Sequence, residues 1–317
     1  MNTQRPRIEI TRQQARGVAA TVATSIALLY AAAAAAQEVP GATGLPMPGQ
    51  ETQGQIAQTE QWARSRVFSI PTGRLVRAGD LRLSFGGLYE PEREQSFFGS
   101  AGVGLGGVAE VEMASQPVVN GFKRGSFNFA TSAFKMQLLK ETEGHPAFSW
   151  TLRGTPGWHT TDREPNGSSF RFRMVRLYAS MSREIRDLDT HFGVSVADVR
   201  VKDMKGWENA PQGDLQKNLF APFAAVTYRS NPQARVLAEV EAIPRFEFDP
   251  NRRPSKKDIG LVWVGMVGVR YSLSPSVALD SGVSYRSDYR GLADASIHGG
   301  LNVLFPLRNL KSQPARK

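Results

Sequence analysis

Residues 261–273 read LVWVGMVGVRYSL, and the alternation within this stretch decides the fold class. One parity is apolar or small, with Trp263 and Tyr271 near its ends, while the other parity includes Arg270 and Ser272. A period of two places successive side chains on opposite faces of a β-strand. The stretch therefore predicts a strand with one apolar face that is edged by aromatic side chains.

The same two-faced pattern recurs along the chain, and helical periodicity is nearly absent. Residues 277–286 show it most clearly, with Leu279 and Val283 on one face and Asp280 and Arg286 on the other. We find eleven such segments, each about 9 to 14 residues long, with turn residues between them. The clearest alternation within these segments covers 81–89, 105–113, 134–138, 148–153, 171–184, 192–201, 220–228, 236–241, 261–273, 277–286 and 297–305.

The connections between these segments separate a membrane barrel from a soluble β-sandwich, which also alternates. Short connections follow Glu141, Glu184, Ser230 and Leu273, and long ones rich in Gly, Pro, Asn and charge lie between them. Short turns on one rim and long loops on the other are typical of outer-membrane barrels. The sequence therefore predicts an all-β protein that forms a closed, antiparallel, up-and-down transmembrane β-barrel.

The strand count is constrained because single-chain bacterial barrels have even numbers of strands. Eleven segments leave one strand missing, and we expect it within Arg64–Leu75 (RSRVFSIPTGRL). The prediction is thus about 12 strands, within a range of 10 to 14.

The two ends of the chain differ from the barrel segments. Residues 1–16 contain four arginines and residues 17–36 carry no charge, which predicts a signal peptide (1–36) that is cleaved near Ala36. A permanent membrane anchor is the alternative reading. Residues 37–64 are rich in Pro, Gly and Gln and predict a flexible segment, followed by the barrel (65–306) and a basic tail (307–317).

Composition narrows the function classes. The chain has no Cys, which excludes disulfides and metal–thiolate sites. Its 39 Lys and Arg against 29 Asp and Glu give a net charge of +10, but the basic residues are dispersed, and an exported chain is not expected to meet nucleic acid. A mean hydropathy of −0.32 agrees with strands in which one residue in two faces lipid.

Few motifs point to chemistry. Residues 102–107 (GVGLGG) match G-x-G-x-x-G, but they continue into an alternating strand, so they favour close packing of the barrel wall over a dinucleotide site. The four histidines lack metal-ligand spacing, and there is no G-x-S-x-G motif. We therefore expect no cofactor, no metal and no enzyme activity.

The polar parity of the strands supplies the candidate functional residues. They are expected to face the lumen and form either a hydrated passage for polar solutes or a network of ion pairs that fills the barrel. An arginine replacing Val267 on the lipid face should cost about 2–4 kcal/mol, and Asp280→Asn far less. The candidates are Arg82, Glu110, Glu112, Lys135, Gln137, Arg153, Glu239, Glu241, Arg270, Asp280, Arg286 and Asn302.

Two further stretches predict partners. His298, Gly300, Val303 and Phe305 follow the pattern of a closing strand that the barrel-assembly machinery recognises, although the tail PLRNLKSQPARK continues after them. The loop NRRPSKK carries four basic residues that could contact lipopolysaccharide phosphates or an acidic polysaccharide: Arg252, Arg253, Lys256 and Lys257.

Residues 70–84 (IPTGRLVRAGDLRLS), 133–141 (AFKMQLLKE) and 146–154 (PAFSWTLRG) resemble the YjbH-like outer-membrane barrels associated with exopolysaccharide production. The resemblance covers most of residues 66–305. It implies an outer-membrane protein with a role in polysaccharide secretion or surface organisation, and it supplies no catalytic residues.

Three functional hypotheses follow from these patterns. The first is a passive outer-membrane pore or an accessory protein in exopolysaccharide export. The second is a structural barrel with a plugged lumen whose loops bind surface polymers. The third is a soluble periplasmic β-sandwich that acts as a binding module.

Overall fold

The computed structural model describes residues 65–89, 96–120, 125–161, 168–207, 210–211, 213–249 and 252–307. The predicted signal peptide (1–36), the predicted flexible segment (37–64) and the tail beyond Leu307 lie outside these residues. Within the described ranges, no helix is long and apolar enough to cross a membrane.

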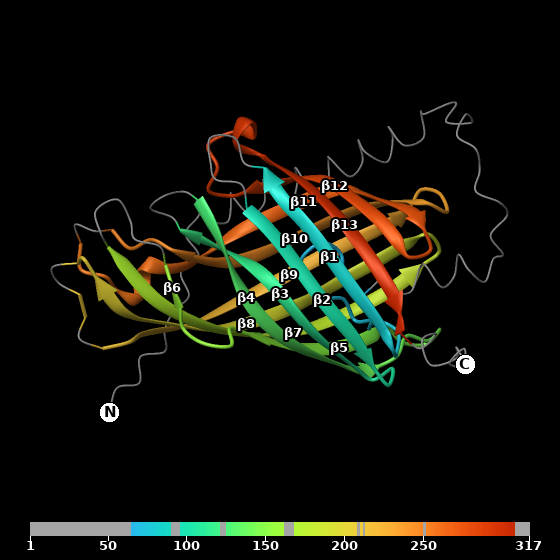
Figure 1. Cartoon of the computed structure of the whole chain (residues 1–317), viewed down its shortest axis with the longest axis horizontal. Helices are drawn as coiled ribbons and strands as arrows, with labels where there is room; N and C mark the ends of the chain where they lie inside the picture. Colours follow the sequence, from blue (N-terminus) through green and yellow to red (C-terminus); the bar gives the residue numbers. More distant parts are fainter. Residues whose placement is uncertain are drawn as a thin grey trace, which may run out of the picture.

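The described chain is almost entirely β-structure (Figure 1). Two 3-10 turns, η1 (Lys256–Asp258) and η2 (Leu292–Asp294), lie in long connections. The strands are β1 (Asp80–Tyr89), β2 (Ser96–Leu105), β3 (Ala109–Asn120), β4 (Gly125–Leu139), β5 (Ala147–Gly154), β6 (His159–Thr160), β7 (Ser169–Ile185), β8 (Leu188–Lys205), β9 (Leu215–Arg229), β10 (Ala234–Phe246), β11 (Ile259–Ser274), β12 (Val277–Arg286) and β13 (Ser296–Pro306).

Twelve of these strands form a closed antiparallel ring. Each strand pairs with its neighbour in sequence, β5 pairs with β7, and β1 pairs with β13 from Asp80↔Pro306 to Tyr89↔Ile297. The two-residue strand β6 pairs only with the outer end of β7. Closure gives every barrel strand two partners, which is the condition for placing a sheet in hydrocarbon. The predicted fold class and strand count are thus confirmed.

The position of the missing strand was predicted wrongly. The twelfth strand is β2, between β1 and β3 in the ring, and residues 65–75, the described part of the predicted segment, contribute no barrel strand. The sequence of β2, SFFGSAGVGL, hides its alternation because glycines occupy several positions. In residues 65–75, Pro71 lacks an N–H group for a strand ladder and several amides bond to side chains inside the barrel.

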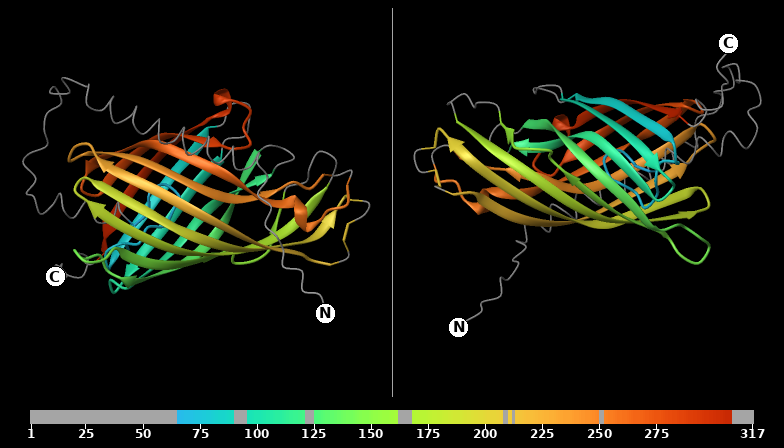
Figure 2. Two further views of the ribbon diagram at one scale, coloured as in Figure 1. Left: turned by 180° about the vertical axis from the view of Figure 1, so that it is seen from behind. Right: turned by 60° about the horizontal axis from the view of Figure 1, so that its bottom comes forward.

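The two rims differ as the loop lengths predict. Tight connections join β2 to β3, β7 to β8 and β11 to β12 at one rim, where β1 begins and β13 ends. The other rim carries the long connections. Strands β7 and β8, with 17 and 18 residues, extend beyond the ten-residue strands β1 and β12 at the long-loop rim, as both views in Figure 2 show.

Side chains on the outer face of the barrel are apolar and exposed. Met113 is 64% exposed, Phe220 63% and Val283 51%. Alternate positions on the same strands point inward and are largely polar and buried. A soluble sandwich would bury its apolar face, so this distribution contradicts the sandwich hypothesis and fits a barrel in lipid.

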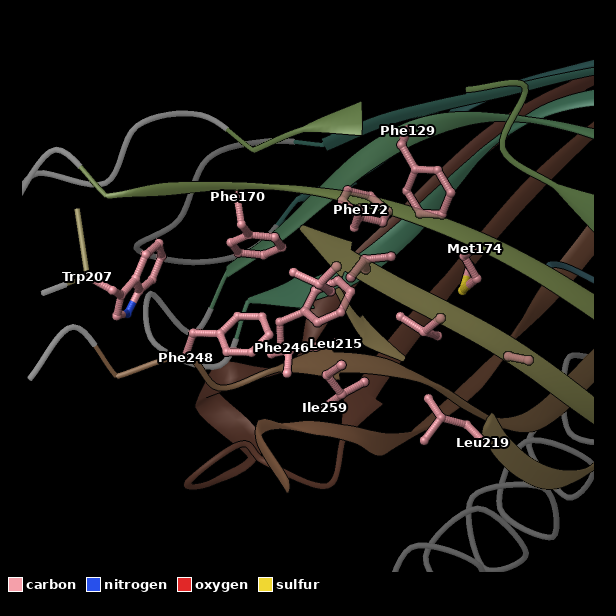
Figure 3. Packing of buried hydrophobic residues seen from close by; sticks show 14 residues of the cluster. Phe129, Phe170, Phe172, Met174, Trp207, Leu215, Leu219, Phe246, Phe248 and Ile259 are labelled. Atoms are coloured by element: carbon pink, nitrogen blue, oxygen red, sulfur yellow. The ribbon is translucent and has the colours of Figure 1, made fainter. Parts of the chain in front are cut away.

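The polarity of the two faces reverses at the extended end of β7, β8 and β9. Phe170, Phe172 and Met174 point inward there, while Arg171 and Arg173 point outward. The inward residues join an apolar cluster with side chains of β3, β4, β8, β9, β10 and β11 (Figure 3). This part of the sheet is built like that of a soluble protein, which indicates that it projects beyond the bilayer.

The apolar cluster closes one side of the barrel mouth. Phe170 packs edge-on against Phe246 and Phe248, with ring centroids 5.2 and 5.0 Å apart. At the same level, β3 and β10 approach from opposite walls and pair in parallel at Arg245↔Val119 and Phe246↔Asn120. The sequence did not predict an apolar core inside the barrel.

Candidate functional site

The structure places the predicted lumen residues on the inner face of the barrel. Each charged candidate is at most 7% exposed: Arg82, Glu110, Glu112, Lys135, Arg153, Glu239, Glu241, Arg270, Asp280 and Arg286. Buried charges require partners, because an unpaired charge in a low-dielectric interior is very costly. The contacts of these side chains therefore decide between a hydrated passage and a filled lumen.

The space between them is occupied by residues 65–79, which we call the plug segment and which Figure 2 shows as the blue stretch before β1. Its first part is a tight hairpin, with Val67 N donating to Ile70 O (3.2 Å) and Thr72 N donating to Ser65 O (3.2 Å). Ile70 is fully buried. The segment predicted to be the twelfth strand thus fills the lumen instead.

Glu239 on β10 binds the tip of the plug hairpin. Its carboxylate accepts hydrogen bonds from the backbone N–H groups of Phe68 (2.9 Å), Ser69 (3.0 Å) and Ile70 (3.4 Å). Ser69 Oγ lies 2.5 Å from a carboxylate oxygen of Glu239 and 2.5 Å from one of Glu241, and its single proton is available to one of them at a time. The carboxylate thereby satisfies amides that no neighbouring strand pairs, and it gains charge-assisted hydrogen bonds in return.

Glu112 on β3 binds the plug from the opposite wall. One carboxylate oxygen accepts from Arg66 (2.9 Å) and from Arg153 (3.1 Å), and the other accepts from Arg82 (2.9 Å). Three guanidinium groups thus converge on one carboxylate. Only one of them belongs to the plug, so the wall arginines orient Glu112 for Arg66.

Cations of the wall also bind plug carbonyl groups. Lys135 Nζ donates to Ser65 O (2.9 Å) and to the carbonyl of Arg74. Arg270 Nη2 donates to Val67 O (2.8 Å), while its Nε and Nη2 atoms each lie 2.7 Å from a carboxylate oxygen of Asp280. Asp280→Asn would therefore leave a buried arginine without its counter-ion, which contradicts the expectation that this substitution is mild.

At the short-turn rim, Arg74 anchors the base of the plug. Its guanidinium lies 2.9 Å from Glu141 and 2.8 Å from Asp189. Burial raises the pKa of the Glu141 carboxyl, but hydrogen bonds from the Glu184 N–H (2.7 Å) and from Arg74 outweigh it and lower the pKa below its ordinary value. Glu141 therefore remains ionised and paired at neutral pH.

Gly104 explains part of the glycine-rich motif in β2. A Cβ atom at this position would lie 2.3 Å from the carbonyl oxygen of Arg77 and 2.4 Å from that of Val76. Only glycine lets the returning plug segment approach the wall so closely. Gly106 and Gly107, with φ of 60° and 71°, form the tight turn that follows.

Two more predicted residues bind the plug, since Glu110 accepts from Val76 N (3.1 Å) and Gln137 Nε2 donates to Gly73 O (3.0 Å). Arg286 pairs with Asp288 (2.9 Å) near the long-loop rim. In the closing strand, His298 is buried and its ring contacts Phe68 of the plug edge-on at 5.2 Å, while Phe305 points outward and is 45% exposed. Gly300 lies inward and Val303 outward on the same strand.

A small cavity of about 100 Å³ lies beside the plug tip, between strands on opposite sides of the barrel. Its walls include Phe68, Arg82, Arg176, Arg270, His298 and Asn302. A cavity of this volume has room for a few water molecules. Among the described residues, no group of three or more His, Asp or Glu side chains is arranged to hold a metal ion.

The sequence analysis missed the plug segment and two of the inward residues that support it. Arg176 donates to Ser195 Oγ (2.9 Å) and to Ala242 O (2.9 Å), and its guanidinium stacks on the buried Tyr178 ring at 4.5 Å. Both residues lie on the inward parity of a stretch whose alternation is weak. A stricter assignment of parity along 171–184 would have identified them.

In the basic loop, the side chains of Arg252, Arg253, Lys256 and Lys257 are exposed at the long-loop rim. Arg252 pairs with the buried Asp258 at 2.5 Å. Asp258 also closes a capping box with Ser255 at the start of η1. One of the four basic residues is thus engaged in holding the loop.

Solved structures with a similar fold are outer-membrane barrels. The NanC porin is 13% identical over 70% of this chain and 98% of its own, with a TM-score of 0.40. OmpT of Vibrio cholerae is 9% identical over 73% and 99%, with a TM-score of 0.38. LpxR from Salmonella typhimurium is 10% identical over 71% and 100%, with a TM-score of 0.40. No family model and no curated protein matches the chain.

These likenesses concern the fold alone. The chain has the architecture of an outer-membrane β-barrel, and its apolar outer face is suited to contact with membrane lipids. The expectation that the chain is not an enzyme is wrong as an exclusion, because an outer-membrane barrel fold is compatible with catalysis. The lack of a familiar catalytic motif therefore does not rule out catalysis.

Proposed function

We propose that this chain is an outer-membrane barrel whose lumen is closed by its own plug segment, so that it is not a passive open pore. The observation that carries the proposal is the binding of Glu239 to three consecutive plug amides. A passage for solutes needs hydrated, accessible charges. Here the lumen charges bind the chain itself.

The proposal draws support from both walls of the barrel. Glu112 and Glu239 hold the plug from opposite sides, and Lys135 and Arg270 bind its carbonyl groups. Displacing the plug would break these contacts together, while Glu112 and Arg270 would keep their ion pairs with residues of the wall. Hydrogen bonds to charged groups contribute about 1.5–3 kcal/mol each, so their combined loss favours a plug that stays in place.

Conductance in planar bilayers tests the closed lumen. We expect no channel events from the folded wild-type protein and brief openings from the double variant Glu112→Gln, Glu239→Gln, whose plug has lost both anchoring carboxylates. Glu247→Gln, which alters an exposed carboxylate at the long-loop rim, should stay silent. Heat-modifiable gel mobility establishes that each variant is folded. Steady wild-type conductance would overturn the proposal.

A role in exopolysaccharide export remains a proposal that rests on the YjbH-like resemblance. With the lumen filled, that role would belong to the outer surface and the long loops. Retention of the purified barrel on an immobilised acidic polysaccharide, compared with a variant in which Arg253, Lys256 and Lys257 are replaced by glutamine, tests it. Equal retention of the two proteins would show that the basic loop does not bind the polysaccharide.

A further inference from the structure

The reversal of polarity on β7, β8 and β9 marks where the barrel leaves the apolar layer. On β7, the outward residues from Val175 to Met181 are apolar, and the next outward residues are Arg173 and Arg171. On β8, Val196 is followed outward by Asp198, Arg200 and Lys202. Apolar residues give way to charged ones at the same level on both strands.

The distance between two arginines on β7 agrees with this boundary. Arg183 and Arg173 both point outward and lie ten residues apart, near the two ends of the apolar stretch. Ten residues span about 34 Å along a strand, or about 26 Å across the bilayer at a tilt of about 40°. The apolar band of outer-membrane barrels is about 25 Å tall, so Arg173 lies at headgroup level on the long-loop side.

Four cations form two adjacent rungs at this level, which we call the basic block. Arg173 lies directly opposite Arg200 across the β7–β8 pair, and Arg171 lies directly opposite Lys202. Like charges that face each other across a sheet destabilise it. Because two such pairs lie side by side here, a bound anion would offset the repulsion between the four cations.

The chain itself only partly neutralises the basic block. Arg171 pairs with Asp203 (3.1 Å) and Arg200 with Asp198 (3.3 Å), and all four side chains of these pairs are more than one-third exposed. Lys202 Nζ lies 4.1 Å from the centre of the Trp158 ring. Within the described residues, the Arg173 guanidinium has neither an ion pair nor a hydrogen bond. Four cations against two carboxylates leave a charge of +2.

We propose that the basic block binds a phosphate group of the anionic glycolipid of the outer leaflet, lipopolysaccharide. Guanidinium groups bind phosphate with two parallel hydrogen bonds, and Arg173 and Arg200 present two of them side by side. The block adjoins a groove of about 600 Å³ whose charged lining residues are Arg171, Lys202 and Lys205 together with Asp203 and Asp214. The groove gives space for the sugar that carries the phosphate, and the apolar strands below it accommodate acyl chains.

Binding of purified lipid A to the full-length folded protein in detergent tests this site. The double variant Arg173→Gln, Arg200→Gln should bind about thirtyfold more weakly, because each basic residue near an anionic membrane surface contributes about fivefold. The matched control is Lys140→Gln, Arg290→Gln, which removes the same charge from exposed side chains outside both the basic block and the basic loop. It should bind like the wild type, and both variants should keep heat-modifiable mobility.

Two further arms identify the ligand group. Lipid A from which the phosphates have been removed should bind about as weakly to the wild type as intact lipid A binds to the block variant. Inorganic phosphate should compete poorly. Equal affinity of block variant and wild type, undiminished binding of dephosphorylated lipid A, or full displacement by inorganic phosphate at millimolar concentration would each overturn the proposal.

Discussion

Replacing Glu239 with glutamine removes the charge that holds the plug hairpin while preserving the size of the side chain. Oε2 accepts from Phe68 N and Ile70 N, and Oε1 accepts from Ser69 N and its hydroxyl. In the amide, one of these oxygens becomes an NH2 group that faces N–H donors. The remaining hydrogen bonds become neutral and therefore about half as strong.

The magnitude follows from these contacts. Leaving one or two buried N–H groups without an acceptor costs about 1–3 kcal/mol each, and loss of the charge weakens the other bonds further. We take about 3 kcal/mol as the total, which raises the fraction of molecules with a displaced plug about a hundredfold.

Thiol labelling measures that fraction, because the chain contains no cysteine. Val67 lies in the hairpin and is 2% exposed, so Val67→Cys provides a single thiol that reacts only when the plug moves. The labelling rate should rise about a hundredfold in the Glu239→Gln background and stay unchanged with Glu247→Gln. A rate that changes less than about twofold, or a thiol that is already fully reactive beside native Glu239, would refute the reasoning.

Three further predictions concern the barrel wall and the base of the plug. Val267→Arg, which faces outward between Ala238 and Val283, should destabilise the barrel by about 2–4 kcal/mol in urea titrations from vesicles, while Leu273→Arg near the rim should cost about 0–1 kcal/mol; equal costs would contradict the assigned depth. Asp280→Asn should cost about 3–5 kcal/mol by the same measurement because Arg270 stays buried and charged, and adding Arg270→Met should recover much of the loss; a single variant as stable as the wild type would disprove the ion pair. Glu141→Gln should lower the urea concentration at the unfolding midpoint at neutral pH, where the carboxylate is ionised. The difference from the wild type should vanish as the pH falls through the lowered pKa of Glu141. A difference that persists in acid would show that the charge of Glu141 is not involved.

The sign of the last effect follows from the direction of the pKa shift. The folded protein holds the pKa of Glu141 below the ordinary value, so the ionised form binds Arg74 more favourably in the folded state than in the unfolded one. That contribution is fully present above the ordinary pKa of a glutamate. It decreases as the carboxyl becomes protonated in both states.

The sequence by itself determined the fold class, the difference in loop length between the two rims, and which side chains of most strands face outward. Alternation such as that of 277–286 is a local property, because successive side chains of a strand must point to opposite sides. The lengths of the connections are equally local. The alternation and the connection lengths can both be recognised from the sequence alone, because each strand separately has one face toward lipid and one toward the polar interior.

Only the tertiary structure decided what fills the lumen. Residues 65–79 contain one Pro and two Gly and have the sequence pattern of an irregular edge strand, yet their amides bond to Glu239, about 170 residues away in the sequence. From the sequence, the inward charges could line a passage for solutes. Their actual partner is the plug segment, which is not one of the barrel strands and so was not considered. The reversal of polarity on β7 and β8 likewise became visible only from the register, which pairs Arg173 with Arg200. Long-range pairing of polar groups leaves no periodic signal, since it depends on which walls of the barrel face each other.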